Sequence, residues 1–203
     1  MRIGLFGGSF SPIHMGHLAV GALVKDFANL DKVAYLPVGV HTEKIRLLPK
    51  EHRVNMVKLA IEDNPDFDIC LYEVERETYS YTYETLKALS TQHPDWELYF
   101  IIGSDILPQI PRKWYQGKQL LSEFKFLVFG RSSQSQIARV IARDPQLKNF
   151  QHNLIPVPMR FSFNISSTLI REQVQQGRTI RYLVPWKVEE YIYRHNLYQD
   201  GSE

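Results

Sequence analysis

The chain has 203 residues, of which 44% are hydrophobic, and this suits one domain with a sizeable core. The net charge of +2 is too small for a general nucleic-acid or membrane surface, so we expect neither kind of partner. The single cysteine excludes an internal disulfide, and no long apolar span or signal-peptide pattern occurs, so we expect a soluble, cytoplasmic protein.

Short β-branched and aromatic runs alternate with longer runs of helical periodicity along the chain. The predicted strands are residues 2–6, 32–37, 67–74, 96–102, 125–129 and 153–157. The predicted helices are residues 16–29, 50–62, 82–92, 134–142, 167–176 and 185–195. Residues 39–49 and 108–119 are expected to be loops, the first lying over a site. The alternation favours a parallel α/β sheet whose ligands bind at the carboxyl ends of the strands.

The first predicted strand is joined to the first helix by a glycine-rich loop with the sequence Gly7-Gly8-Ser9-Phe10-Ser11-Pro12-Ile13-His14-Met15-Gly16-His17. Backbone N–H groups of such a loop point above the sheet edge, and glycine lets a phosphate approach them. Histidine adds charge and protons near neutral pH. The loop lacks the spacing of the dinucleotide fingerprint, and no Walker-type P-loop occurs. The combination predicts phosphate chemistry.

The pattern Gly-Gly-Ser-Phe-x-Pro-Ile-His-x-Gly-His resembles the signature of the His-x-Gly-His nucleotidyltransferases, and it is most similar to the bacterial nicotinate-mononucleotide adenylyltransferase family. The family commonly has Asp at the position of Ser11. The resemblance implies a Rossmann-like, doubly wound parallel sheet. It also implies one nucleotidyltransferase domain over residues 1–203, with a small C-terminal helical part from about residue 164.

The resemblance further implies that His14 and His17 contact ATP phosphates and stabilise the charge that develops during transfer. The rest of the loop's ATP contacts would come from Gly7, Gly8, Ser9 and Phe10. Carboxylate partners for a histidine metal site are not evident in the sequence. We therefore expect Mg²⁺ to arrive with ATP, held by phosphate oxygens and water, and no dedicated metal site.

A second motif, Ile165-Ser166-Ser167-Thr168-Leu169-Ile170-Arg171, opens the helix that begins near residue 167. Ser166 or Ser167 suits an N-cap, and helical spacing puts Ser167 and Arg171 on one face. The motif matches the family's Ile-Ser-Ser-Thr-x-Ile-Arg, which implies that Ser167, Thr168 and Arg171 bind ATP phosphates.

Two further contacts to ATP follow from the resemblance. The family's Gly-x-Asp contacts the ribose and adenine, and Gly103 and Asp105 stand in its place, although Ser104 or Asp105 equally suits the cap of a short helix. Arg131 is a candidate for a further phosphate contact.

The acceptor pocket is expected at Ser80-Tyr81-Thr82 and Trp114-Tyr115. An indole stacks well on a flat pyridinium ring, and a ring carboxylate needs a hydroxyl and a backbone N–H. In the family these come from the threonine and the Trp-Tyr pair, which implies Thr82, Trp114 and the Tyr115 backbone. Trp96 and Trp186 match no pocket motif, so we expect them in the core.

The loop after the second strand departs from the family. The family has Pro-Pro-His-Lys where this chain has His41-Thr42-Glu43-Lys44. Lys44 keeps a cation that can reach a phosphate, and we count it with the acceptor site. In the helix that follows, His52-Arg53 fits the family's pattern and equally fits an exposed helix face.

The implied activity transfers AMP from ATP to nicotinate mononucleotide and yields deamido-NAD and pyrophosphate. ATP and the mononucleotide would be the partners, and a homo-oligomer is compatible with the sequence. A nicotinamide-mononucleotide or dual-specificity enzyme is the nearest alternative. Phosphopantetheine ranks lower as acceptor, because such enzymes are shorter and lack the Ser-Tyr-Thr and Trp-Tyr features. An alternative of another class is a non-catalytic nucleotide-binding or sensing module, although both histidines are retained.

Overall fold

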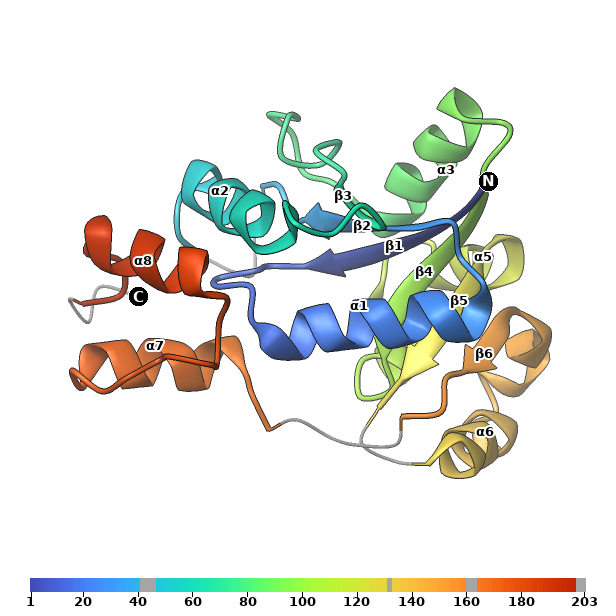
Figure 1. Cartoon of the computed structure of the whole chain (residues 1–203). Coiled ribbons are helices and arrows are strands. Elements are labelled where there is room, and N and C mark those ends of the chain that lie inside the picture. Colours follow the sequence, from blue (N-terminus) through green and yellow to red (C-terminus); the bar gives the residue numbers. More distant parts are fainter. Residues whose placement is uncertain (41–46, 131–132, 160–163, 200–203) are drawn as a thin grey trace.

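A computed structural model describes residues 1–40, 47–130, 133–159 and 164–199. Its strands all run parallel in one sheet with the order β3-β2-β1-β4-β5-β6 (Figure 1). Their bounds are β1 (Arg2–Gly8), β2 (Lys32–Pro37), β3 (Phe67–Ile69), β4 (Glu97–Gly103), β5 (Lys125–Phe129) and β6 (Leu154–Pro156). The predicted doubly wound, Rossmann-like α/β sheet is confirmed.

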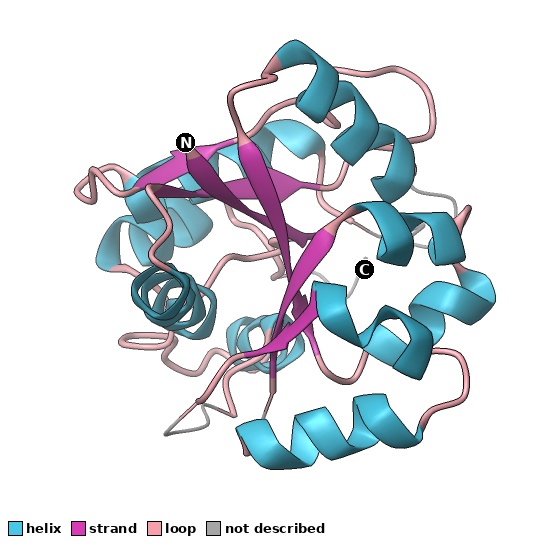
Figure 2. Ribbon diagram, turned by 90° about the vertical axis from the view of Figure 1, so that its right-hand side faces the viewer, coloured by secondary structure: helices cyan, strands magenta, loops and turns pink. Residues whose placement is uncertain are grey.

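Helices cover both faces of the twisted sheet (Figure 2). The α-helices are α1 (Met15–Ala28), α2 (Lys50–Ile61), α3 (Thr82–Gln92), α4 (Ile110–Lys113), α5 (Gly117–Glu123), α6 (Gln134–Arg143), α7 (Ser167–Gln175) and α8 (Trp186–Arg194). Two 3₁₀ helices are η1 (Leu107–Gln109) and η2 (Lys148–Asn153). Within the described ranges, no helix combines the length and apolarity that crossing a bilayer requires.

Two hydrophobic clusters flank the sheet because side chains alternate between its faces along each strand. Tyr99 and Ile101 of β4 enter one cluster, with apolar residues of α1, α2, α7 and α8. Leu98, Phe100 and Ile102 enter the other cluster, with apolar residues of α3, α4, α5 and α6. Strands buried on both faces in this way read as nearly continuous apolar runs in the sequence.

The strand order reverses between β1 and β4. The chain builds β1, β2 and β3 toward one edge of the sheet, then returns to place β4 on the other side of β1. The loops after β1 and β4 therefore diverge to opposite faces and leave a crevice between them, where ligands bind in open sheets of this kind. Gly8 ends β1 and Gly103 ends β4, so both predicted ATP motifs open onto this crevice.

Some predicted elements are wrong. The stretch 108–119 is largely helical: Pro108 and Pro111 lie in the first turns of η1 and α4, where proline starts a helix as readily as it breaks one. β3 is shorter than predicted, because the chain turns soon afterwards, with the Glu75 N–H donating to the Leu71 carbonyl at 3.0 Å. Trp186 is 66% exposed rather than in the core.

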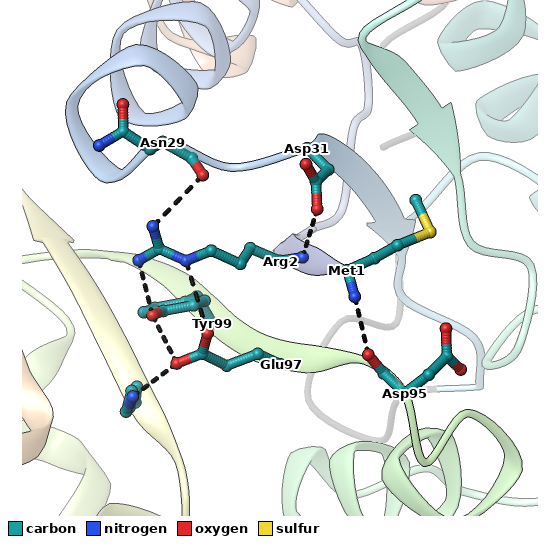
Figure 3. A network of polar contacts seen from close by, with 8 residues as sticks. Met1, Arg2, Asn29, Asp31, Asp95, Glu97 and Tyr99 are labelled. Atoms are coloured by element: carbon teal, nitrogen blue, oxygen red, sulfur yellow. Dashed lines mark hydrogen bonds and ion pairs between the residues drawn. The ribbon is translucent and has the colours of Figure 1, made fainter.

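A polar network joins the strands at their amino ends, away from the crevice (Figure 3). Arg2 Nη2 donates to the Tyr99 hydroxyl at 2.8 Å, and this hydroxyl donates to Glu97 Oε1 at 2.8 Å. The Arg2 backbone N–H donates to Asp31 Oδ2 at 2.7 Å, and the terminal amine donates to the Asp95 carbonyl at 2.7 Å. The Arg2–Glu97 pair is substantially exposed and contributes at most about 1 kcal/mol.

Candidate active site

His14 and His17 together cap the amino end of α1. His14 is the N-cap residue, with φ −147° and ψ 170°, and its Nδ1 accepts from the His17 backbone N–H at 3.3 Å. In return, His17 Nδ1 accepts from the His14 backbone N–H at 3.3 Å. The two rings stack with centroids 3.6 Å apart and an interplanar angle of 21°. The His-x-Gly-His motif is thus a capping box built from two imidazoles.

This geometry fixes the proton on each neutral ring. Each Nδ1 accepts a backbone hydrogen, so it carries no proton and the ring N–H lies on Nε2. Burial lowers the pKa of His14 to about 4. Burial, and then the charge of His14, hold the pKa of His17 well below 6.5. Near neutral pH the pair is therefore uncharged and carries two Nε2–H donors that the cap does not use.

Close packing keeps these rings in place. A Cβ on Gly16 would lie 3.0 Å from His14 Nδ1, so glycine between the histidines leaves room for the ring. The Phe10 ring meets the His17 ring edge to face, with centroids 5.1 Å apart. It also packs so closely against Gly8 that a side chain at that position would contact it. Phe10 is 1% exposed and has φ 48°, so the loop turns sharply to bury it.

The loop is tied to the C-terminal helices through its carbonyl groups. Ser167 Oγ donates to the Pro12 carbonyl at 2.9 Å, and Arg171 Nη1 donates to the Ser11 carbonyl at 2.9 Å. The Ser11 hydroxyl lies 3.1 Å from that of Tyr198. Position 11, where the family commonly has Asp, thus meets a buried phenol in this chain. Ser166, one of the two serines expected to cap α7, is its N-cap and accepts from the Leu169 N–H at 3.1 Å.

A cavity of about 1060 Å³ opens where the loops after β1 and β4 diverge, which is at the upper end of the range for ligand pockets. Ten of the predicted site residues line it: Gly7, Gly8, His14, His17, Thr82, Gly103, Asp105, Trp114, Tyr115 and Ser167. They come from both ends of the chain and from both sides of the strand reversal. These ten predicted ATP and acceptor residues therefore share one cavity.

One wall of the cavity is aromatic. Tyr81 and Tyr115 stack with centroids 4.5 Å apart, and both are exposed at the cavity. Trp114 is partly buried beside them, with its ring edge to face with Phe100 at 6.4 Å. Thr82 begins α3 next to Tyr81. This wall offers flat apolar faces together with hydroxyl groups, a combination that suits a planar ring with a polar substituent.

Sequence reasoning missed Glu73, a buried carboxyl in the cavity wall that is 6% exposed. It accepts from Thr85 Oγ1 at 2.9 Å. Burial raises its pKa, against the lowering effect of hydrogen bonds from Thr85 and the Gly39 backbone. Its neighbours Glu75 and Glu77 make the stretch look like a solvated surface, so nothing in the sequence marks it. Lys113, next to Trp114, also lines the cavity and was missed.

Other predicted site residues lie elsewhere. Ser9 and Phe10 belong to the loop after β1 but do not line the cavity. Thr168 and Arg171, on α7, do not line it either. Arg171 Nη2 instead lies 3.4 Å from Thr168 Oγ1. Lys44, with the rest of the His41-Thr42-Glu43-Lys44 stretch, and Arg131 fall outside the described residues.

The residues that the structure describes contain no group of three or more His, Cys, Asp or Glu side chains that could hold a metal ion. Among the described residues, the carboxyl groups that line the cavity are those of Glu73 and Asp105, and Glu73 is engaged by Thr85.

Solved structures with the same architecture include the nicotinic acid mononucleotide adenylyltransferase of Plasmodium falciparum. Its complex with NaAD superposes with a TM-score of 0.78 at 23% identity, over 97% of each chain. Its complex with APC gives a TM-score of 0.77 over 97% of this chain and 96% of that one. At this level of identity the agreement shows the fold.

The sequence comparisons go further. Residues 5–173 match the model of the cytidylyltransferase-like family. A protein of Caldicellulosiruptor saccharolyticus named "Probable nicotinate-nucleotide adenylyltransferase" is 38% identical over 98% of this chain and 100% of its own length. A protein of the same name from Halalkalibacterium halodurans is 38% identical over 99% of this chain and 93% of its own length. With its paired histidines at the strand reversal, the chain belongs to the cytidylyltransferase-like family and, within it, to the nicotinate-nucleotide adenylyltransferases.

Proposed function

We propose that this protein transfers the adenylyl group of ATP to nicotinate mononucleotide, yielding deamido-NAD and pyrophosphate. The observation that carries the proposal is the pair of neutral imidazoles, His14 and His17, capping α1 at the cavity. The relatives' names and the NaAD held by the Plasmodium falciparum structure support the choice of substrates.

The reaction needs no covalent enzyme intermediate. A phosphate oxygen of the mononucleotide attacks the α-phosphorus of ATP, the bond to the bridging oxygen breaks, and pyrophosphate leaves in line. Negative charge grows on the non-bridging oxygens and on the leaving group. The Nε2–H groups of His14 and His17 and the amino end of α1 would donate toward that charge, without transferring a proton.

Magnesium accompanies ATP in this proposal and neutralises phosphate charge when it is bound. The chain's own part is positional. Ser167 lies at the cavity and holds the loop through the Pro12 carbonyl, while Arg171 holds it through the Ser11 carbonyl. Gly103 and Asp105, at the end of β4, would take the ribose and adenine.

The acceptor would lie against the aromatic wall. Trp114 would stack on the pyridinium ring, and Thr82 with the Tyr115 backbone would bind its carboxylate. Lys113 supplies a cation at the same wall. The buried carboxyl of Glu73 also lines the cavity, and it accepts from Thr85 on α3, the helix that Thr82 begins. Acid and amide acceptors differ in one group on the ring, so they must be compared directly.

The test is product formation from ATP and Mg²⁺ with nicotinate mononucleotide or nicotinamide mononucleotide in parallel reactions, resolved by chromatography. We expect a strong preference for the acid. Comparable use of the amide would show that the wall does not select the carboxylate and would support the dual-specificity alternative. ATP binding in calorimetry without turnover of either acceptor would refute the activity and leave a nucleotide-binding module.

A further inference from the structure

Arg53 on α2 is a buried cation behind the site. It is 3% exposed, so of the two interpretations of this position the exposed helix face is wrong. Its guanidinium donates to carbonyl groups of three segments: Nε to Leu48 at 3.1 Å, Nη1 to Ser9 at 3.0 Å and Nη2 to Val38 at 2.8 Å. Leu48 precedes α2, Ser9 lies in the loop after β1, and Val38 follows β2.

A packing role does not account for this residue. Burying a guanidinium costs much of its hydration, and an apolar side chain of similar size would fill the same space without that cost. Burial lowers the pKa of Arg53, but arginine stays charged at any physiological pH. What the guanidinium offers beyond volume is a rigid planar fork whose donors point in fixed directions.

The Arg53 guanidinium joins the segments after β1 and β2, whose residues Gly8 and Val38 form what we call the cavity floor. Ser9 and Val38 are already neighbours, because the Val38 N–H donates to the Gly8 carbonyl at 2.9 Å. Gly8 and Val38 both line the cavity. Since the peptide group is planar and trans, turning the Ser9 carbonyl toward Arg53 turns the Phe10 N–H to the opposite side. The guanidinium thus sets the orientation of a peptide group in the loop that leads to His14.

The other end of this loop is held independently from α7. Ser167 and Arg171 hold the carbonyl groups of Pro12 and Ser11, while Arg53 holds that of Ser9. The loop is therefore fixed from both sides before it reaches the α1 cap. Neither Gly103 nor Asp105 contributes an acceptor to Arg53, so the predicted adenosine contacts are not part of this arrangement.

We propose that Arg53 is a positioning residue for adenylyl transfer: it holds the loop after β1 against the segment after β2, and thereby places His14 and the cavity floor for the reaction. This inference rests on the proposed function for its kinetic consequence. Its structural part, the joining of three segments, does not depend on which substrate is used.

Two variants test it. Arg53→Lys keeps the charge but cannot span three carbonyls with a planar fork, and Arg53→Met keeps the volume without charge. Displacing a reacting group by 1 Å costs roughly a hundredfold in rate, so we expect kcat to fall about 10- to 100-fold. KM for ATP should stay within about threefold, because the adenosine contacts are untouched. Ile141→Ala, in the opposite cluster, is the control: it lowers Tm and leaves kcat within about twofold.

Hydrogen exchange gives a readout that needs no substrate. In Arg53→Lys we expect faster exchange at the amides of residues 8–10, 38–40 and 47–48, with protection in α6 unchanged. If Arg53→Met does not fold, kcat and hydrogen exchange of Arg53→Lys alone test the inference. Unchanged exchange in these segments, or kcat within twofold of wild type, would overturn the inference. Absence of wild-type turnover with nicotinate mononucleotide would refute the proposed function alone, because the exchange result would still stand.

Discussion

The buried His14 cap predicts a specific loss of stability in acid. The unfolded imidazole binds a proton below its ordinary pKa of 6.5, whereas the folded one does so only below about 4. Stability is therefore complete above pH 6.5 and falls as the pH drops from 6.5 toward 4. The displaced pKa corresponds to about 3 kcal/mol at the limit, of which about 2 kcal/mol is lost between pH 7.5 and pH 5. His17, with its pKa also lowered, adds to the loss in the same direction.

His14→Asn isolates this effect, because asparagine is a good N-cap and does not titrate in this range. Urea unfolding at pH 7.5 and at pH 5 gives the free energy of unfolding of both proteins at both pH values. Between those pH values the variant should lose about 2 kcal/mol less than wild type. The histidines outside the cap are the same in both proteins, so their contributions cancel. His17 keeps its burial in the variant and loses only the smaller, pKa-lowering effect of the His14 charge, which makes the variant's own loss smaller still. Equal losses in the two proteins would refute the neutral, buried cap and with it the proton assignment to Nε2.

Three further substitutions test the rest of the site. Gly16→Ala should stabilise the helix by up to about 1 kcal/mol, which thermal unfolding measures. It should also lower kcat about tenfold, measured by initial rates, because the added Cβ presses on the His14 ring. Trp114→Ala should raise KM for nicotinate mononucleotide about tenfold and leave KM for ATP unchanged, and an equal rise in both would contradict a stacking role. Arg171→Met should lower Tm by a few degrees and kcat about tenfold through the lost bond to the Ser11 carbonyl, and wild-type kinetics would remove Arg171 from the account.

The parts of the site that the sequence predicted are those whose local chemistry is self-contained. Glycines after a strand, followed by histidines at the start of a helical run, predict a loop and the beginning of a helix. The cap that the two imidazoles form was not predicted. The motif at Ser166 contains its own N-cap. The loop and the start of α7 lie where the sequence predicts them. The alternation of strands with helices predicted the parallel sheet, but not the order of its strands.

The parts that were missed depend on contacts between distant segments. Arg53 looks like a residue of an exposed helix face until the loops after β1 and β2 are seen to supply its acceptors. Glu73 is charged and sits among other glutamates, yet the fold buries it against Thr85. The prolines at 108 and 111 mark loops or helix starts equally well, and only packing against the second cluster decides between them.

In the proposed reaction, uncharged imidazoles at the α1 cap stabilise the phosphates during transfer, and the kcat of His17→Ala measures this contribution. We expect kcat to fall about 100- to 1000-fold in a protein that remains folded. The matched control His93→Ala removes an imidazole that stacks on Trp96 instead, and it should keep wild-type kcat. Near-wild-type turnover by a folded His17→Ala protein would contradict this role of the imidazoles.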